Sequence, residues 1–233
     1  MTVSLRHVRT VVLPGTGSDD DYAHRAFADP LHQVGAVPVT PRPRPAALID
    51  GYWAALDAAA AHGPIAVGGV SIGAAVAVAW ALRHPDHTVA VLAALPAWTG
   101  DPSGCPAAGS ALATAAQLRR DGLAATTAQM AAASPAWLAA ELTRSWRGQW
   151  PGLPEAMETA AGYVAPTGTE LAALRAPLGV AAAADDPIHP LAVGAEWVAA
   201  VDRGALRVLT LEEIGADPAA LGRACLAALA EAG

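Results

Sequence analysis

The chain contains no lysine, and all fourteen of its basic residues are arginine. This absence excludes a serine–lysine dyad, a Schiff base on lysine and a nucleotide site built on a P-loop lysine. The exclusive use of arginine is also typical of a GC-rich, bacterial coding sequence.

Charge and cysteine are scarce as well. Charged residues make up 15% of the chain, and the formal net charge is -7. A negative balance argues against nucleic-acid binding, which requires a basic surface opposite the phosphates. Cys105 and Cys225 show neither metal-ligand spacing nor a disulfide framework. We therefore expect no metal, no other cofactor and a reducing, cytoplasmic location.

The sequence also lacks a convincing membrane segment. Its start, MTVSLRHVRTVVL, does not have the layout of a signal peptide. Residues 63–82 are uncharged and long enough to span a bilayer. The motif GGVSIG interrupts this run, however, and a buried strand followed by a buried helix explains it better. We expect no membrane contact.

What is present is an alternation of strand and helix patterns. This order predicts an α/β protein with a mostly parallel sheet of about six strands flanked by helices. Strands are expected at 7–13, 35–39, 64–70, 88–98, 176–186 and 205–213, and helices at 46–63, 72–83, 190–201 and 218–232.

The alternation is interrupted between the fourth and fifth strands. Residues 99–176 show no strand pattern, so we interpret them as a helical cap inserted into a core made of residues 1–98 and 177–233. Helices are expected there at 107–120, 122–133, 135–147, 154–164 and 168–175. Trp137 and Trp146 lie in this insertion, where they either form its own core or line an apolar ligand pocket.

Ser71 is the best candidate for a reactive residue. It stands in GGVSIGA, two positions from Gly69 and two from Gly73, after a predicted strand and before a predicted helix. This pattern is that of a nucleophile elbow, in which a sharp turn presents the hydroxyl at the carboxyl end of the sheet. The amino terminus of the following helix favours negative charge there.

Together with LPGTGSDD, DDPIHP and the helical cap, the elbow makes the chain resemble α/β-hydrolases over nearly its whole length. The resemblance implies a serine hydrolase that cleaves a small-molecule carboxylic ester or thioester through an acyl-enzyme on Ser71. It also implies two backbone donors for the oxyanion. These would be the amide of Ile72 and that of Thr16, with Gly17 next in line.

The resemblance places a catalytic acid after the penultimate strand, where Asp186 is our choice and Asp185 the alternative. The acyl part of the substrate would be apolar, and Trp98, Trp137 and Trp146 are candidates to contact it. The sequence leaves the oligomeric state open.

The catalytic base is the point of departure from the family pattern. Its histidine is expected in the loop after the last strand, where this chain has Gly215 and Ala216, and no histidine follows His189. His7, His62, His84 and His87 are expected at the opposite edge of the sheet. For His24 and His189 we favour surface or capping roles.

Three explanations stay open for Ala216. It replaces the base in an engineered variant, it marks a natural loss in a ligand-binding pseudo-hydrolase, or the chemistry is that of a lyase or isomerase of secondary metabolism on the same fold. We favour the first, because the rest of the apparatus is intact. On this hypothesis the present chain is strongly impaired as an enzyme.

Overall fold

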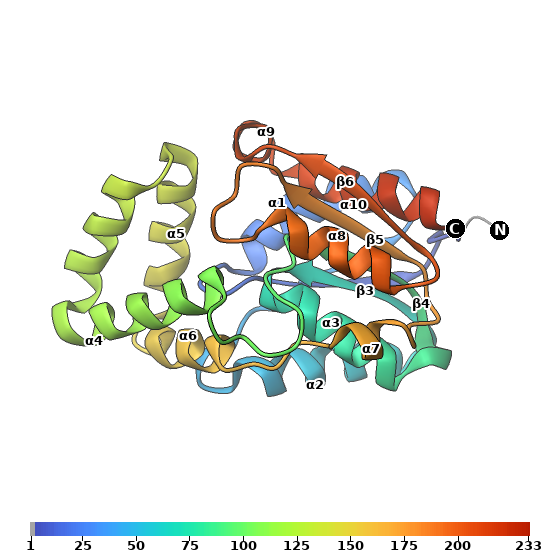
Figure 1. Ribbon diagram of the computed structural model, residues 1–233, viewed down its shortest axis with the longest axis horizontal. Helices are drawn as coiled ribbons and strands as arrows, with labels where there is room; N and C mark the ends of the chain where they lie inside the picture. The colour runs from blue at the N-terminus through green and yellow to red at the C-terminus, as the bar shows by residue number, and fades with distance from the viewer. Residues whose placement is uncertain (1–2) are drawn as a thin grey trace.

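The computed structural model describes residues 3–233, so the first two residues of the predicted core segment lie outside it. Its centre is a six-stranded sheet in which all neighbouring strands are parallel, in the order β2-β1-β3-β4-β5-β6 (Figure 1). The strands are β1 (Arg9–Leu13), β2 (Val37–Val39), β3 (Ile65–Val70), β4 (Thr88–Ala94), β5 (Leu178–Ala183) and β6 (Gly204–Leu209). The predicted fold class is confirmed.

Helices cover both faces of this sheet. Side chains alternate between the faces along each strand, so that Val11 and Leu13 join one buried cluster and Val12 joins the other. On the first face lie α2 (Leu48–Ala60), α3 (Ile72–Arg83) and α8 (Leu191–Ala200). On the second lie α1 (Asp20–Gln33) and α10 (Ala219–Ala232). Short 3-10 turns, η1 (Pro45–Ala47) and η2 (Pro85–His87), precede α2 and β4.

Small residues let the helices approach the sheet closely. A Cβ atom on Gly179 of β5 would lie 2.3 Å from the backbone oxygen of Cys225 in α10. All six residues of β3 and of β5 are buried. The alanine- and glycine-rich composition is therefore what permits tight packing of helices on these strands.

The segment after β6 differs from the expectation. The strand ends at Leu209, and Leu211–Ala216 form a short helix, α9. The side chain of Thr210 accepts a hydrogen bond from the amide of Glu213, and the Glu213 carboxylate accepts one from the amide of Thr210. This capping box ends the extended conformation that the letters LTLEE suggested.

The insertion between β4 and β5 is helical, as predicted from the missing strand pattern. Figure 1 shows α4, α5 and α6 grouped at the end of the molecule opposite the two termini. The helices are α4 (Pro106–Ala133), α5 (Ala136–Gln149), α6 (Leu153–Ala161) and α7 (Gly168–Leu171). Gly122, at φ 77°, interrupts α4 one residue after the break at 121 that the sequence suggested between two helices.

The first three of these helices share a small apolar cluster. It contains Ala115, Leu118, Trp146, Leu153 and Met157. The helix α7 instead packs beside α8 and α3. Within residues 3–233, no helix combines the length and the hydropathy needed to cross a bilayer.

Candidate active site

Ser71 occupies the turn between β3 and α3. Its backbone has φ 55° and ψ -118°, which is unusual for a residue with a side chain. A Cβ atom on Gly69 would lie 2.4 Å from the carbonyl carbon of Gly73, and one on Gly73 would lie 2.3 Å from the backbone oxygen of Leu13. Only glycine fits at both positions, so the sequence spacing is explained by sterics.

The turn places Ser71 at the carboxyl ends of the central strands. The Ser71 amide donates to the backbone oxygen of Ala94 at the end of β4 (2.9 Å), and the residue is 8% exposed. Ile72 is the first residue of α3, so its amide has no acceptor within the helix. This amide is the one expected to bind an oxyanion.

Asp186 and His189 lie together in the loop between β5 and α8. One carboxylate oxygen of Asp186, Oδ1, accepts hydrogen bonds from the amides of Ile188 (2.8 Å) and His189 (3.2 Å). The other, Oδ2, lies 2.8 Å from Nδ1 of the His189 ring. The loop therefore folds around the carboxylate and sets the imidazole against it.

The far side of the same ring contacts the serine. Nε2 of His189 lies 3.0 Å from Oγ of Ser71. A carboxylate can only accept hydrogen bonds, so Nδ1 carries the proton in the neutral ring and Nε2 is left to accept from the serine hydroxyl. Ser71, His189 and Asp186 thus form one hydrogen-bonded series with the geometry of a catalytic triad.

The electrostatics of the series favour an ionised Asp186. Burial of its carboxyl acts to raise the pKa, but the ring of His189 and the two backbone amides stabilise the charged form. Their combined effect holds the pKa of Asp186 below its ordinary value. A persistent negative charge beside the imidazole is what a triad needs when the ring takes up a proton.

The two adjacent aspartates have different partners. Asp185 is exposed, and its Oδ1 accepts a hydrogen bond from the amide of Leu211 (2.8 Å), the first residue of α9. Between the two acids left open by the sequence, the geometry therefore selects Asp186.

The expectations for the base need correction. Ala216 is exposed at the end of α9 and lines a surface pocket with Asp217 and Arg223. The position in contact with Ser71 and Asp186 is filled by His189, so the surface or capping role favoured for His189 was wrong. The geometry therefore gives no reason to read Ala216 as a missing base. The signal that could have identified His189 is its spacing, three residues after the acid in DDPIHP.

The turn after β1 lies against the elbow. A Cβ atom on Gly15 would lie 3.5 Å from Cβ of Ser71, and the amide of Ser18 donates to the backbone oxygen of Gly15 (3.1 Å). Thr16 is half-buried, whereas Gly17 is buried with φ 71°. Both candidate oxyanion donors thus belong to a tight turn next to the serine.

The three candidate tryptophans differ in their surroundings. The indole N–H of Trp98 donates to the backbone oxygen of Tyr163 (3.2 Å). Trp137 of α5 lies against Gly215, where a Cβ atom would come within 2.2 Å of its ring. Trp146 is 4% exposed, and its Nε1 has no hydrogen-bond partner among the described residues.

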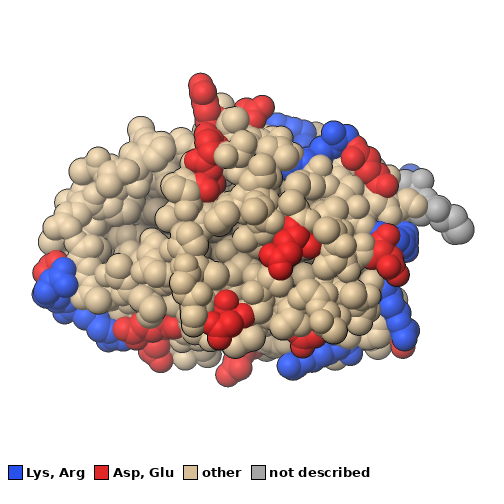
Figure 2. Space-filling model, viewed as in Figure 1, with Lys and Arg blue, Asp and Glu red and all other residues tan. Residues whose placement is uncertain are grey.

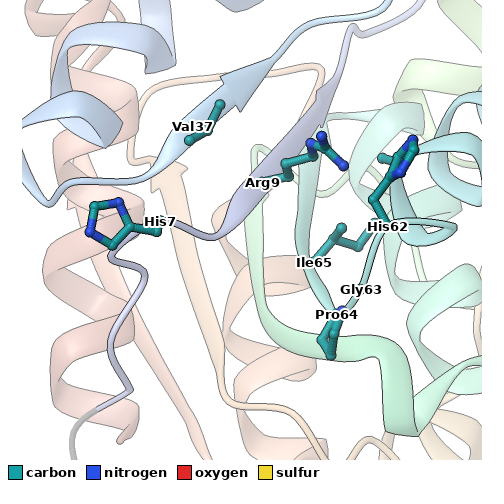
Figure 3. A pocket seen from close by; sticks show the side chains of 8 residues that line it. His7, Arg9, Val37, His62, Gly63, Pro64 and Ile65 are labelled. Atoms are coloured by element: carbon teal, nitrogen blue, oxygen red, sulfur yellow. The ribbon is translucent and has the colours of Figure 1, made fainter.

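A pocket lies at the amino-terminal edge of the sheet, opposite the elbow. The pocket has a volume of about 370 Å³ and lies beside the amino ends of β1 and β3, and its lining includes His7, Arg9 and His62 (Figure 3). His7 and His62 are thus far from the elbow, as their places before strands indicated. Within residues 3–233, no group of three or more histidine, cysteine, aspartate or glutamate residues could hold a metal ion.

Comparisons with known proteins give structural matches only. No protein-family model matches this chain, and no curated protein matches its sequence. An esterase from Thermogutta terrifontis is 18% identical with a TM-score of 0.67, covering 88% of this chain and 82% of that one. The enol-lactonase from Burkholderia xenovorans is 19% identical with a TM-score of 0.65, covering 89% and 84%.

A hydrolase from Pseudomonas aeruginosa is 19% identical with a TM-score of 0.66, covering 96% of this chain and 90% of that one. At such identities the likeness establishes architecture. The chain therefore has the α/β-hydrolase fold.

Proposed function

We propose that this protein is a serine hydrolase that cleaves a carboxylic ester or thioester through an acyl-enzyme on Ser71. The observation that carries the proposal is the series of two short contacts joining Oγ of Ser71, the ring of His189 and the carboxylate of Asp186. The names of the structural neighbours, an esterase, an enol-lactonase and a hydrolase, agree with it.

The first half-reaction transfers the acyl group to the serine. Oγ of Ser71 attacks the carbonyl carbon while its proton passes to Nε2 of His189. The π electrons of the carbonyl move to its oxygen, which becomes an oxyanion. Asp186 stabilises the imidazolium that results. When the tetrahedral intermediate collapses, the bond to the leaving oxygen or sulfur breaks, and that atom takes the proton from Nε2.

The second half-reaction releases the acid. Water gives a proton to Nε2 and attacks the acyl carbon, and the second tetrahedral intermediate expels Oγ, which recovers its proton from the imidazolium. The amide of Ile72 and that of Thr16 or Gly17 would bind the oxyanion in both halves. No cofactor enters the scheme.

An apolar acyl group suits the surroundings of the site. Figure 2 shows the surface hollowed beside the helices of the insertion and lined there mainly by uncharged side chains. We assign Trp98, Trp137 and Trp146 to the acyl-binding wall and residues 99–176 to a cap over it.

The test is turnover of short-chain p-nitrophenyl esters and of an acyl thioester, with fluorophosphonate labelling read by mass spectrometry. We expect labelling on Ser71 in the unmodified chain. Ser71→Ala and His189→Ala should each lower kcat by about 10⁴-fold or more, as removal of a triad member does elsewhere.

Ala216→His is the matched control, because it restores the family's usual residue at a position exposed on α9. It should leave turnover within about threefold of the unmodified chain. A large gain in Ala216→His, or full activity in His189→Ala, would contradict the assignment. A folded protein that binds esters without Ser71-dependent turnover would be a pseudo-hydrolase.

A further inference from the structure

Two buried polar side chains of α5 are directed at the loop that follows β1. Ser145 and Gln149 are 2% and 7% exposed. They lie four residues apart and therefore on the same face of the helix. A buried polar group is costly unless it finds a hydrogen-bond partner, and both find theirs in the backbone of residues 17 and 18.

These partners form one connected network. Oγ of Ser145 donates to the backbone oxygen of Gly17 (2.5 Å), and Nε2 of Gln149 donates to that of Ser18 (2.8 Å). Nε2 of Gln149 also donates to Oγ of Ser145 (2.9 Å). Each side chain thus fixes the other as well as the loop.

The network determines the orientation of the peptide between Gly17 and Ser18. Its carbonyl is held by Ser145, and its N–H donates to the backbone oxygen of Gly15. Because a peptide group is planar, fixing both ends fixes the plane. The loop contains two glycines among four residues, Pro14–Gly17, and such a segment would otherwise have wide conformational freedom.

The same loop carries the amides to which we assign oxyanion binding. Such donors are effective only when they are already oriented toward the developing charge. We propose that Ser145 and Gln149 are positioning residues that hold the loop of residues 14–18 in its catalytic conformation. This inference rests on the proposed function. It makes the carboxyl-terminal turn of α5 a fixed part of the active site.

Trp146 gives steric support to this arrangement. A Cβ atom on Gly17 would lie 2.8 Å from Nε1 of Trp146, so the absence of a side chain at residue 17 lets α5 come close enough for both hydrogen bonds. At the rim, the guanidinium of Arg144 binds both carboxylate oxygens of Asp19, which follows the loop.

The experiment compares Ser145→Ala, Gln149→Leu and the double variant with Thr126→Ala. Thr126 is a matched control because it is also 2% exposed in the insertion, but its hydroxyl donates to Gly122 within α4. Readouts are kcat and KM for an ester, affinity for a trifluoromethyl ketone that forms an oxyanion on the serine, and amide hydrogen exchange at Gly17 and Ser18.

We expect the double variant to lose about 10- to 100-fold in kcat, with KM changed less than threefold. Its affinity for the ketone should fall in parallel, and exchange at Ser18 should accelerate at least tenfold. Thr126→Ala should show none of these changes at equal thermal stability, and Ser145→Thr, which keeps the hydroxyl, should retain most of kcat.

Unchanged exchange at Ser18 in the double variant would overturn the inference, and so would a loss of kcat no larger than that of Thr126→Ala. Failure of the proposed function is distinguishable, because it would appear as absent Ser71-dependent turnover in the unmodified chain. In that case the exchange at Ser18 still decides whether α5 holds the loop.

Discussion

At the scale of single residues, we expect the adjacent Asp185 and Asp186 to differ sharply in their contribution to kcat. Asp186 binds the imidazole, whereas Asp185 accepts from the backbone of α9. Asp186→Asn should lower kcat by about 10⁴-fold, because an amide neither orients nor stabilises the imidazolium as a carboxylate does. Asp185→Asn should keep kcat within about threefold. Steady-state kinetics of the two variants check this, and equal losses would contradict the geometry.

The depressed pKa of Asp186 also predicts a pH dependence of stability. A carboxyl whose pKa is lower in the folded than in the unfolded state stabilises the fold above the unfolded value, and the contribution is lost as pH falls through the folded pKa. Starting near the ordinary value of 3.8, acidification should therefore destabilise the unmodified chain more steeply than Asp186→Asn. Urea unfolding between pH 2.5 and 6 measures both curves, and parallel curves would refute the prediction.

The elbow at Ser71 was predicted from a local pattern, whereas the histidine that contacts it was expected in another loop, for a physical reason. Gly69 and Gly73 are required by contacts within a few residues of Ser71, or with the adjacent strand end, and such sterics leave a local pattern. The contact between Ser71 and a histidine ring depends instead on the path of a loop in space, which leaves no local pattern. His189 lies in the same loop as Asp186, whereas the expectation for the histidine was tied to the loop after the last strand.

At the scale of elements, α9 is one of the places where the insertion contacts the core. Gly215 of α9 lies under the ring of Trp137 in α5. We predict that Gly215→Ala costs about 1–3 kcal/mol of unfolding free energy, because its Cβ atom would overlap the indole. In a Trp137→Ala background the same change should cost less than about 0.5 kcal/mol.

Chemical denaturation of the four proteins in this double-mutant cycle gives the coupling energy. Additive effects would show that α5 and α9 are not coupled through this contact. A measurable coupling energy would attribute the glycine at position 215 to its packing against Trp137.

Several elements defined by periodicity were predicted well, whereas the helix α1, which was not expected, and the elements defined by capping were not. The strand β3 and the helix α3 follow from a continuous apolar run broken by the elbow, and the observed bounds of α3 agree with 72–83. The helix α9 depends on a reciprocal Thr210–Glu213 cap within a short segment that also fits a strand. The hydrogen bonds between α5 and the loop after β1 join residues that are separated in the sequence by 128 and 131 positions. A local sequence pattern cannot predict a contact over such a separation.

At the scale of the whole molecule, the parallel sheet explains how the site is assembled. In the order β2-β1-β3-β4-β5-β6, the strands β1, β3 and β5 all end at the same edge. The loops that follow them supply the turn with Thr16 and Gly17, the elbow with Ser71, and the acid and imidazole. The parallel sheet can therefore place an imidazole beside Ser71 from the loop after β5 rather than from the loop after the last strand, without a change in architecture.

The two cysteines provide a probe of global unfolding. Cys225 is fully buried between α10 and the sheet, and burial raises the pKa of its thiol, whereas Cys105 is partly exposed. A thiol reagent at neutral pH should therefore modify one cysteine quickly in the folded protein and both in denaturant. In Cys105→Ser, the slow modification of Cys225 should follow the population of the open state and rise with urea in step with unfolding. Rapid reaction of two thiols in the native protein would show that α10 leaves the sheet without global unfolding.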